Sequence, residues 1–198
     1  MNLIEMRARA REDLQDTDAA LYHWTDDEVD GAIRRVILEY SLAAPIQKQD
    51  DLATTIDDTE IDISTLTDIV RIECVEFPIA ESPLSMQPFD YWGGALYMTD
   101  VGDGNDARVR WLQKHTLAAG STTIPVQHDE IIVLGATGYL AMSAAAFTVD
   151  RASIAGRHGT VSYRAWGKER LVRYDDGLNA IRNSNRVVQR RLYTDQYT

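Results

Sequence analysis

The spacing of the apolar residues changes twice along this chain, and these changes constrain its fold more than any single motif. In "WTDDEVDGAIRRVILEYSLAAP", apolar side chains recur at steps of three and four from Val29 to Tyr40. This spacing predicts a helix with one apolar face. Thr25 and Glu28 match a capping box at the start of that helix, and Pro45 marks its end.

The middle of the chain, from about Gln47 to Val126, follows a period of two instead. Apolar and polar residues alternate in "EIDIS", "IVRIECVEF" and "ARVRWLQKHTL", and stretches rich in Gly, Pro, Asn and Asp separate these segments. Such a pattern predicts short strands joined by turns. Because no helical segment lies between them, we expect antiparallel pairing and no βαβ crossovers.

Both ends of the chain are predicted to be helical. A first helix is expected in "NLIEMRARAREDLQD", which is charged outside its apolar positions, and another in "VQHDEIIVLGATGYLAMSAAAFTVD". A final helix follows, in which apolar residues step by three and four from Leu171 to Leu192. We therefore predict an α+β fold, in which a helical frame from both chain ends (1–46 and 128–198) carries an inserted antiparallel β domain (47–127).

One stretch of the third predicted helix, "IIVLGATGYLAM" (131–142), also follows the G-x-x-G-x-x-[GA] spacing of a dinucleotide-binding loop. This spacing supports an alternative function, a nucleotide-dependent oxidoreductase. The fingerprint needs a strand before the glycines and a βαβ unit around them. Here "PVQHDE" precedes the stretch as a helix start, and no second parallel strand follows. We therefore predict a helix with no cofactor, packed closely on a neighbour through Gly135, Gly138, Ala141 and Ala145.

Other side chains with chemical potential are also predicted to be structural. His128, Asp129 and Glu130 are adjacent, so on a helix they point in different directions and cannot share one metal ion. The acidic run 57–62 lacks the spacing and glycine of an EF-hand, and Cys74 lies in a strand-like segment. The four tryptophans are interpreted as core anchors or interface residues. No nucleophile elbow or P-loop occurs, so we predict no catalytic residue, no metal site and no enzyme activity.

Charge is divided unequally along the chain. The net charge is −11, with 10 Lys and Arg against 27 Asp and Glu in residues 1–150, and 10 against 4 in residues 151–198. The basic end therefore suits an acidic partner surface. Its arginines equally suit the negative end of a helix dipole, and both interpretations stay open. The candidate docking residues are Arg182, Arg186, Arg190, Arg191, Leu192, Tyr193 and Tyr197.

The chain contains no apolar run long enough to span a bilayer and no basic-then-apolar leader. We therefore expect a soluble protein that makes no membrane contact.

Several segments resemble head–tail connector (adaptor) proteins of tailed bacteriophages. "DAALYHWTDDEVDGAIRRVILEYSLAAP" is similar to the start of those proteins, where an aromatic-rich "Y-x-W-[ST]-D-x-E-[LV]" step opens a helix that ends at a proline. "PFDYWGGALYMTD", "VRWLQKHTL", "TTIPVQHDEIIVLGATGYLAM" and the arginine-rich final helix follow in the same order as in that group. The resemblance spans nearly the whole chain and involves packing motifs.

The resemblance implies a structural virion protein. Such connectors form a homo-oligomeric ring, usually a dodecamer, that binds the portal protein, extends the DNA channel and presents a platform for the next tail or neck component. The C-terminal segment would reach the portal, and DNA would pass through without sequence-specific binding. The protein would lie in the virion neck after assembly in the host cytoplasm. A tail-completion (terminator) protein, which binds the end of the tail tube, is the second interpretation.

Overall fold

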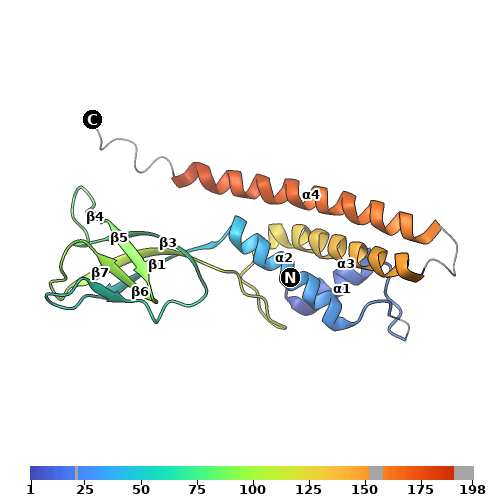
Figure 1. The fold of residues 1–198 in the computed structure, drawn as a ribbon, viewed down its shortest axis with the longest axis horizontal. Coiled ribbons are helices and arrows are strands. Elements are labelled where there is room, and N and C mark those ends of the chain that lie inside the picture. The colour runs from blue at the N-terminus through green and yellow to red at the C-terminus, as the bar shows by residue number, and fades with distance from the viewer. Residues whose placement is uncertain (21, 152–157, 190–198) are drawn as a thin grey trace. The chain divides into compact units, whose positions relative to one another are not determined.

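The computed structural model of the protein describes residues 1–20, 22–151 and 158–189, apart from the side chains of 147–151, 158–162 and 185–189. These residues form four α-helices and two antiparallel sheets (Figure 1), which confirms the predicted α+β class. The chain divides into two compact units. A helical unit contains Met1–Ala44 and the residues from His115 onward, and a β unit contains Pro45–Lys114.

The β unit is shorter than the predicted β domain, 47–127, because the segment that begins at His115 packs with the helices. The backbone N–H of His115 donates to Ser41 Oγ (3.0 Å), and the ring Nε2 of His115 lies 2.8 Å from the carbonyl oxygen of Ala44. Ile124, further along, is buried in the core of the helical unit. The chain therefore leaves the helical unit and returns to it at one place, where His115 is bound to Ala44.

The helical unit consists of α1 (Leu3–Asp13), α2 (Asp26–Ala43), the short 3₁₀ helix η1 (Val126–His128), α3 (Asp129–Arg151) and α4 (His158–Gln189). Capping boxes begin the first two helices, one between Asn2 and Glu5 and the predicted one between Thr25 and Glu28. Each box pairs backbone N–H groups that a helix start leaves without an intrahelical partner.

All four helices share one apolar core. Met6 of α1, Ile33 of α2, Ile132 of α3 and Tyr174 of α4 are each fully buried in it. The apolar stripe predicted for α2 faces this core, as the spacing indicated. Burial of side chains of this size contributes about 1.5–3 kcal/mol each, so packing decides where the helices lie more than helix propensity does.

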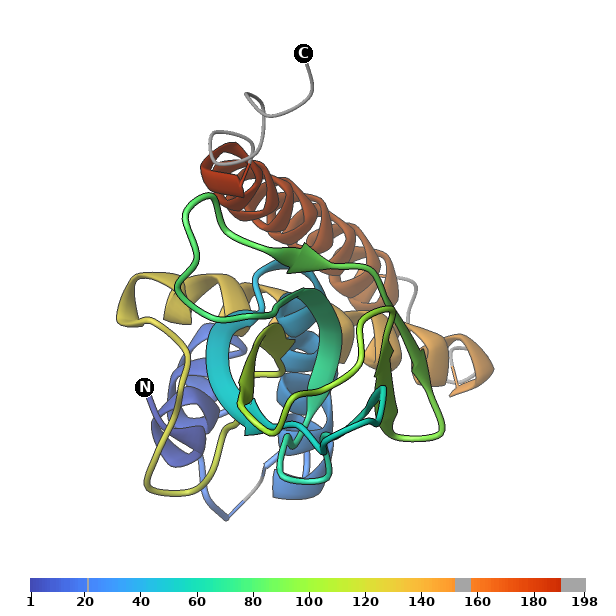
Figure 2. The same ribbon diagram turned by 90° about the vertical axis from the view of Figure 1, so that its left-hand side faces the viewer.

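The strands of the β unit are β1 (Ile46–Ala53), β2 (Glu60–Asp62), β3 (Ile69–Glu76), β4 (Met86–Gln87), β5 (Phe89–Trp92), β6 (Ala95–Met98) and β7 (Asp106–Gln113). They form one sheet in the order β1-β7-β3-β4 and another in the order β2-β6-β5. Every neighbouring pair is antiparallel, as expected from the sequence. Figure 2, which faces this unit, shows that the long strands are strongly curved.

The apolar positions of the period-two segments form a second core. Ile61 and Leu96 from the three-stranded sheet, and Val75 and Val109 from the four-stranded sheet, are fully buried in it. Trp111 is buried beside them. Because side chains alternate between the two faces of a strand, the residues between these positions point outward. On the three-stranded sheet the outward residues Glu60, Asp62 and Tyr97 are exposed, whereas on the four-stranded sheet Glu76 is fully buried and paired with Arg110 (3.0 Å).

Candidate interaction surfaces

Residues 131–142 lie inside α3, with the helix start at Asp129 before them, so they lack the strand and turn of a dinucleotide loop. Their first glycine instead lies where three helices meet. A Cβ atom built on Gly135 would lie 2.9 Å from the ring of Tyr174 in α4 and 3.0 Å from Val36 in α2. Such distances are too short for a real Cβ atom, so the absence of a side chain lets α3 approach both neighbours.

The second glycine brings the backbones of α3 and α4 together. A Cβ atom on Gly138 would lie 2.9 Å from Leu171, and one on Gly167 would lie 3.0 Å from Ala141 and 3.1 Å from the carbonyl oxygen of Gly138. Glycines of the two helices thus face each other. Ala141 and Ala145 are buried as well. The small residues of "GATGYLA" therefore form a contact between helices.

The threonine of the same stretch binds an arginine of α4. Thr137 is fully buried, its hydroxyl lies 2.8 Å from the carbonyl oxygen of Val133, and it accepts a hydrogen bond from Arg170 Nη1 (2.7 Å). Arg170 Nη1 also lies 2.6 Å from a carboxylate oxygen of Asp13 in α1, and its guanidinium stacks over Trp166. This polar contact joins three helices. No sequence pattern marks it, because its members come from distant segments.

A buried arginine organises the loop between α1 and α2. Arg11 donates to Asp16 Oδ2 (2.6 Å), to Asp26 Oδ1 (2.7 Å) and to the carbonyl oxygen of Trp24 (2.9 Å). Its guanidinium lies 3.6 Å from the ring centroid of Tyr22. The side chains of Arg11 and Asp16 are each 6% exposed. This site was missed in the sequence, because an arginine in an amphipathic helix is ordinarily assigned to the exposed face.

A second arginine extends the same network to α2. Arg7 binds Asp30 through two parallel hydrogen bonds (2.8 and 2.7 Å) and Asp26 through a third (2.7 Å). The hydrogen bond from Arg11 is the main cause that lowers the pKa of Asp26. Hydrogen bonds from Thr25 likewise lower the pKa of Glu28, its partner in the capping box. The "YHWTDDE" step, on which the family resemblance depends, therefore forms the joint between α1 and α2.

The three adjacent residues of "HDE" have three separate partners. The hydroxyl of Tyr40 lies 2.6 Å from Nδ1 of His128. Asp129 is paired with the N-terminal amine, and Glu130 lies 3.4 Å from Arg9. The segment therefore joins the start of α3 to α1 and α2, and its side chains diverge.

Proton positions at Tyr40 and His128 follow from their surroundings. Burial, followed by the charge of Asp129, raises the pKa of Tyr40 to about 12. Burial lowers the pKa of His128, and His115 lowers it further. The phenol thus keeps its proton, and its O–H donates a hydrogen bond to Nδ1 of the neutral imidazole.

The pH dependence of stability should report this arrangement. Because the pKa of His128 is lower in the folded state, the unfolded state binds more protons below about pH 6.5, and the contribution of His128 to stability falls as the pH falls. In thermal unfolding, the stability advantage of the wild type over His128→Asn should therefore be largest above pH 7 and shrink towards pH 5. A gap that stays constant over this range would show that His128 titrates alike in both states.

The predicted docking residues lie at the end of α4. Part of the apolar stripe there is already used in folding, because Tyr174, Leu178 and Ile181 are buried in the helical core. Arg182 is exposed, and its Nη1 lies 3.5 Å from the side-chain oxygen of Asn179. Arg186 lies within α4, but its side chain, together with Arg190, Arg191, Leu192, Tyr193 and Tyr197, lies outside the described residues. In the described part of this end, Arg182 is therefore exposed, while the apolar side of the helix faces the helical core.

The tryptophans differ in a way that the sequence did not show. Trp24 and Trp111 are buried, whereas Trp92, at the end of β5, is 79% exposed.

Carboxylates of the acidic run 57–62 accept local hydrogen bonds: Asp58 from the backbone N–H of Glu60 (3.1 Å), and Asp62 from that of Ser64 (2.8 Å). These aspartates stabilise turns beside the strands. The three-stranded sheet, which carries Trp92, thus has an exposed surface where an aromatic side chain and acidic side chains occur together.

Comparison with models of known protein families gave no match, and a search of curated proteins gave none either. Among the described helices, none is both long and apolar enough to cross a membrane. Within residues 1–20, 22–151 and 158–189, no three His, Cys, Asp or Glu side chains are grouped as metal ligands would be.

Proposed function

We propose that this protein is a structural component of a tailed-phage virion, a head–tail connector that forms a ring between the portal and the tail. The observation that carries the proposal is that the residues resembling connectors form contacts between the helices. Trp24, Thr25, Asp26 and Glu28 build the α1–α2 joint, and Gly138 builds the contact of α3 with α4. Motifs that build a scaffold support a structural role more than a catalytic one.

The distribution of charge supports assembly from copies of one chain. Residues 45–114 contain 14 acidic and five basic residues, whereas residues 177–198 contain four arginines and one aspartate. Complementary faces of this kind favour a heterologous contact, in which one surface of each copy meets a different surface of its neighbour. A mostly acidic ring would repel phosphate and let DNA slide through its channel without specific binding.

A terminator at the end of the tail tube is the second candidate, since it would use the same ring architecture. The two candidates differ in their partner, which is the portal for a connector and the tail tube for a terminator. In the connector, the residues that follow α4, from Arg190 onward, would reach the portal, and the neck of the virion would be the site of action.

Native mass spectrometry at several protein concentrations tests the ring. We expect closed species whose masses are whole multiples of the 22.3 kDa chain, ending at one large ring, with no additional ligand mass. Denaturing mass spectrometry of the same sample provides the control for the subunit mass. A monomer or dimer that carries the mass of a dinucleotide would overturn the connector proposal and favour the oxidoreductase.

A further inference from the structure

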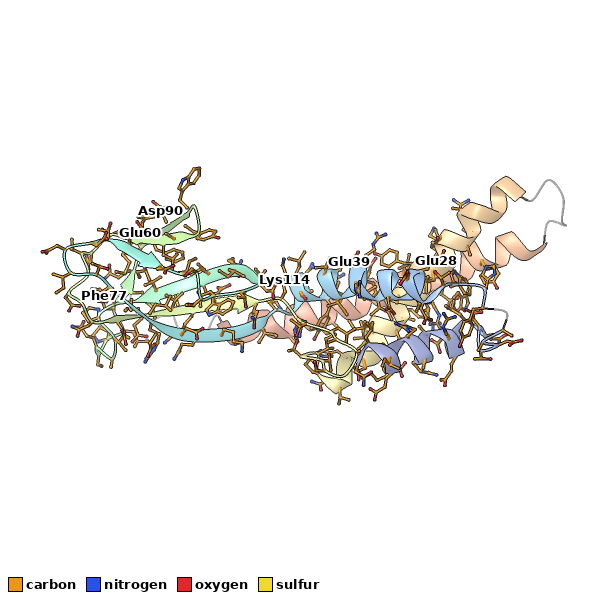
Figure 3. The ribbon with its side chains drawn as sticks, turned by 90° about the horizontal axis from the view of Figure 1, so that it is seen from below. Glu28, Glu39, Glu60, Phe77, Asp90 and Lys114 are labelled. Atoms are coloured by element: carbon orange, nitrogen blue, oxygen red, sulfur yellow. The ribbon has the colours of Figure 1, made fainter. Side chains whose placement is uncertain are left out.

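One outward face of the three-stranded sheet combines aromatic and acidic side chains. Tyr97 of β6 is paired with Glu60 of β2 on one side and with Asp90 of β5 on the other. In the neighbouring row, Asp62 and Trp92 flank the small residue Ala95. Since side chains two positions apart share a face of a strand, these rows lie on the same side of the sheet. We call Glu60, Asp62, Asp90, Trp92 and Tyr97 the aromatic–acidic face; Figure 3 labels Glu60 and Asp90 within it.

Both aromatic side chains of this face are exposed, and one of them lies beside a tight turn. Tyr97 is 37% exposed, and Trp92 is among the most exposed large apolar side chains of the described residues. Trp92 immediately precedes Gly93 and Gly94, whose positive φ angles (64° and 87°) close a tight hairpin. A short, closed hairpin restricts the backbone that carries the indole, so less backbone entropy is lost on binding. Exposed aromatic residues on a rigid element are typical of binding surfaces.

The surroundings of this face are uniformly negative. Residues 52–70 and 77–107, which include all three of its strands, contain ten acidic residues and no lysine or arginine. The charge of Glu60 is the main cause that raises the pKa of Tyr97. The basic residues of the β unit lie in β1, β3 and β7 or directly after β7, on the other sheet. A ligand for the aromatic–acidic face must therefore be cationic.

Guanidinium groups fit this combination best. An arginine stacks on an indole or phenol ring through cation–π attraction, and it binds carboxylates through paired hydrogen bonds. A lysine stacks on aromatic rings less well, and it lacks the planar guanidinium that makes paired hydrogen bonds to a carboxylate. The chain carries an arginine-bearing segment of its own at the end of α4.

The spacing of those arginines matches the spacing of the face. Arg182, Arg186 and Arg190 are four residues apart, and the first two lie in α4, where such a step advances about 6 Å along one side of a helix. The two rows of the face lie two strand residues apart, which is about 6.6 Å. Successive arginines of one helix could therefore meet successive rows of the sheet.

We infer that the aromatic–acidic face binds the arginine-bearing end of α4 from a second copy of this chain. The inference rests on the proposed function, because it names the contact through which neighbours in the ring would join. Each copy offers one face and one helix end, so the contact is heterologous and can continue from copy to copy.

Substitutions on the face should weaken assembly. Glu60→Lys with Asp90→Lys, and separately Trp92→Ser, should each raise the protein concentration needed for half-assembly at least about tenfold, as judged by light scattering after size exclusion. The matched controls are Glu81→Lys and Leu84→Ser, which change an exposed acidic and an exposed apolar residue of the same unit outside the face. Circular dichroism checks that each variant is folded. Unchanged assembly of the folded face variants would overturn the inference.

A mixing experiment distinguishes a contact between copies from one within a copy. The face variant Glu60→Lys/Asp90→Lys and the helix variant Arg182→Glu/Arg186→Glu should each fail to assemble alone. Mixed in equal amounts, they should assemble, because a lysine face meets a glutamate end and an acidic face meets an arginine end alternately. Failure of the folded mixture to assemble would overturn the inference.

The outcomes also separate this inference from the proposed function. Rings that form despite the face substitutions would leave the connector proposal standing and remove the aromatic–acidic face from it. Rescue that produces open chains instead of closed rings would support the contact and contradict the connector.

Discussion

Replacement of Arg11 by methionine should lower the free energy of unfolding of the protein by about 3–5 kcal/mol, as expected when one partner of a buried ion pair is removed. Methionine fills a similar volume but donates no hydrogen bond. The carboxylate of Asp16, whose side chain is 6% exposed, would lose the guanidinium that balances its charge. Domains are typically stable by only about 5–15 kcal/mol, so the loss should be evident in urea unfolding followed by circular dichroism.

Two variants control this result. Arg9→Met removes a partly exposed arginine from the same helix, whose ion pairs lie at the surface, and should change stability by less than about 1 kcal/mol. Asp16→Asn combined with Arg11→Met removes the unpaired charge and should recover part of the loss. If Arg11→Met and Arg9→Met were equally stable, the buried network would not be what joins α1 to α2.

Replacement of Gly135 by valine should destabilise the helical unit by about 2–3 kcal/mol, because added atoms must displace the ring of Tyr174 or Val36, which lie 2.9 and 3.0 Å from the position of a Cβ. Valine is a better helix former than glycine, which offsets only a few tenths of a kcal/mol of this cost. The change should lower the midpoint of thermal unfolding measured by circular dichroism.

Gly31 provides a matched control within α2. A Cβ atom there meets nothing within 4 Å, so Gly31→Val should change stability by less than about 0.5 kcal/mol. Equal effects at the two glycines would contradict the close packing of α3 against α2 and α4.

Most of the secondary structure was predictable because apolar spacing marks most of the elements. The strand β1 was not predicted, because its sequence IQKQDDLA has no apolar alternation and its side chains are mostly exposed. Steps of three and four mark the buried side of α2, and the period of two marks the inward row of β7. In β3 the predicted alternation through Ile72 and Cys74 was wrong after Ile72, because a register shift turns Val75 into the core and leaves Cys74 only partly buried. The capping box at Thr25 was predictable too, since it is a local pattern. These features depend on residues that are close in sequence.

Features that depend on distant residues were not predictable in the same way. The burial of Arg11 requires Asp16, Trp24 and Asp26 to converge, and the role of Thr137 requires Arg170, 33 positions later. Sequence patterns also give no register, so they could not show which tryptophans of the chain face inward. The docking role of the α4 end stays a prediction, because most of its residues lie outside the described part of the chain.

The place where His115 is bound to Ala44 has an evolutionary consequence. The strands that enter and leave the β unit, β1 and β7, are paired from Ile46 and Gln113 onward, so its two chain connections lie side by side as a two-stranded stem. An insert attached in this way can be exchanged, enlarged or lost while both chain segments of the stem stay joined and the helical core is unchanged. Because the two units have separate cores, changes in the length or composition of the insert need not alter the residues that form the helical core.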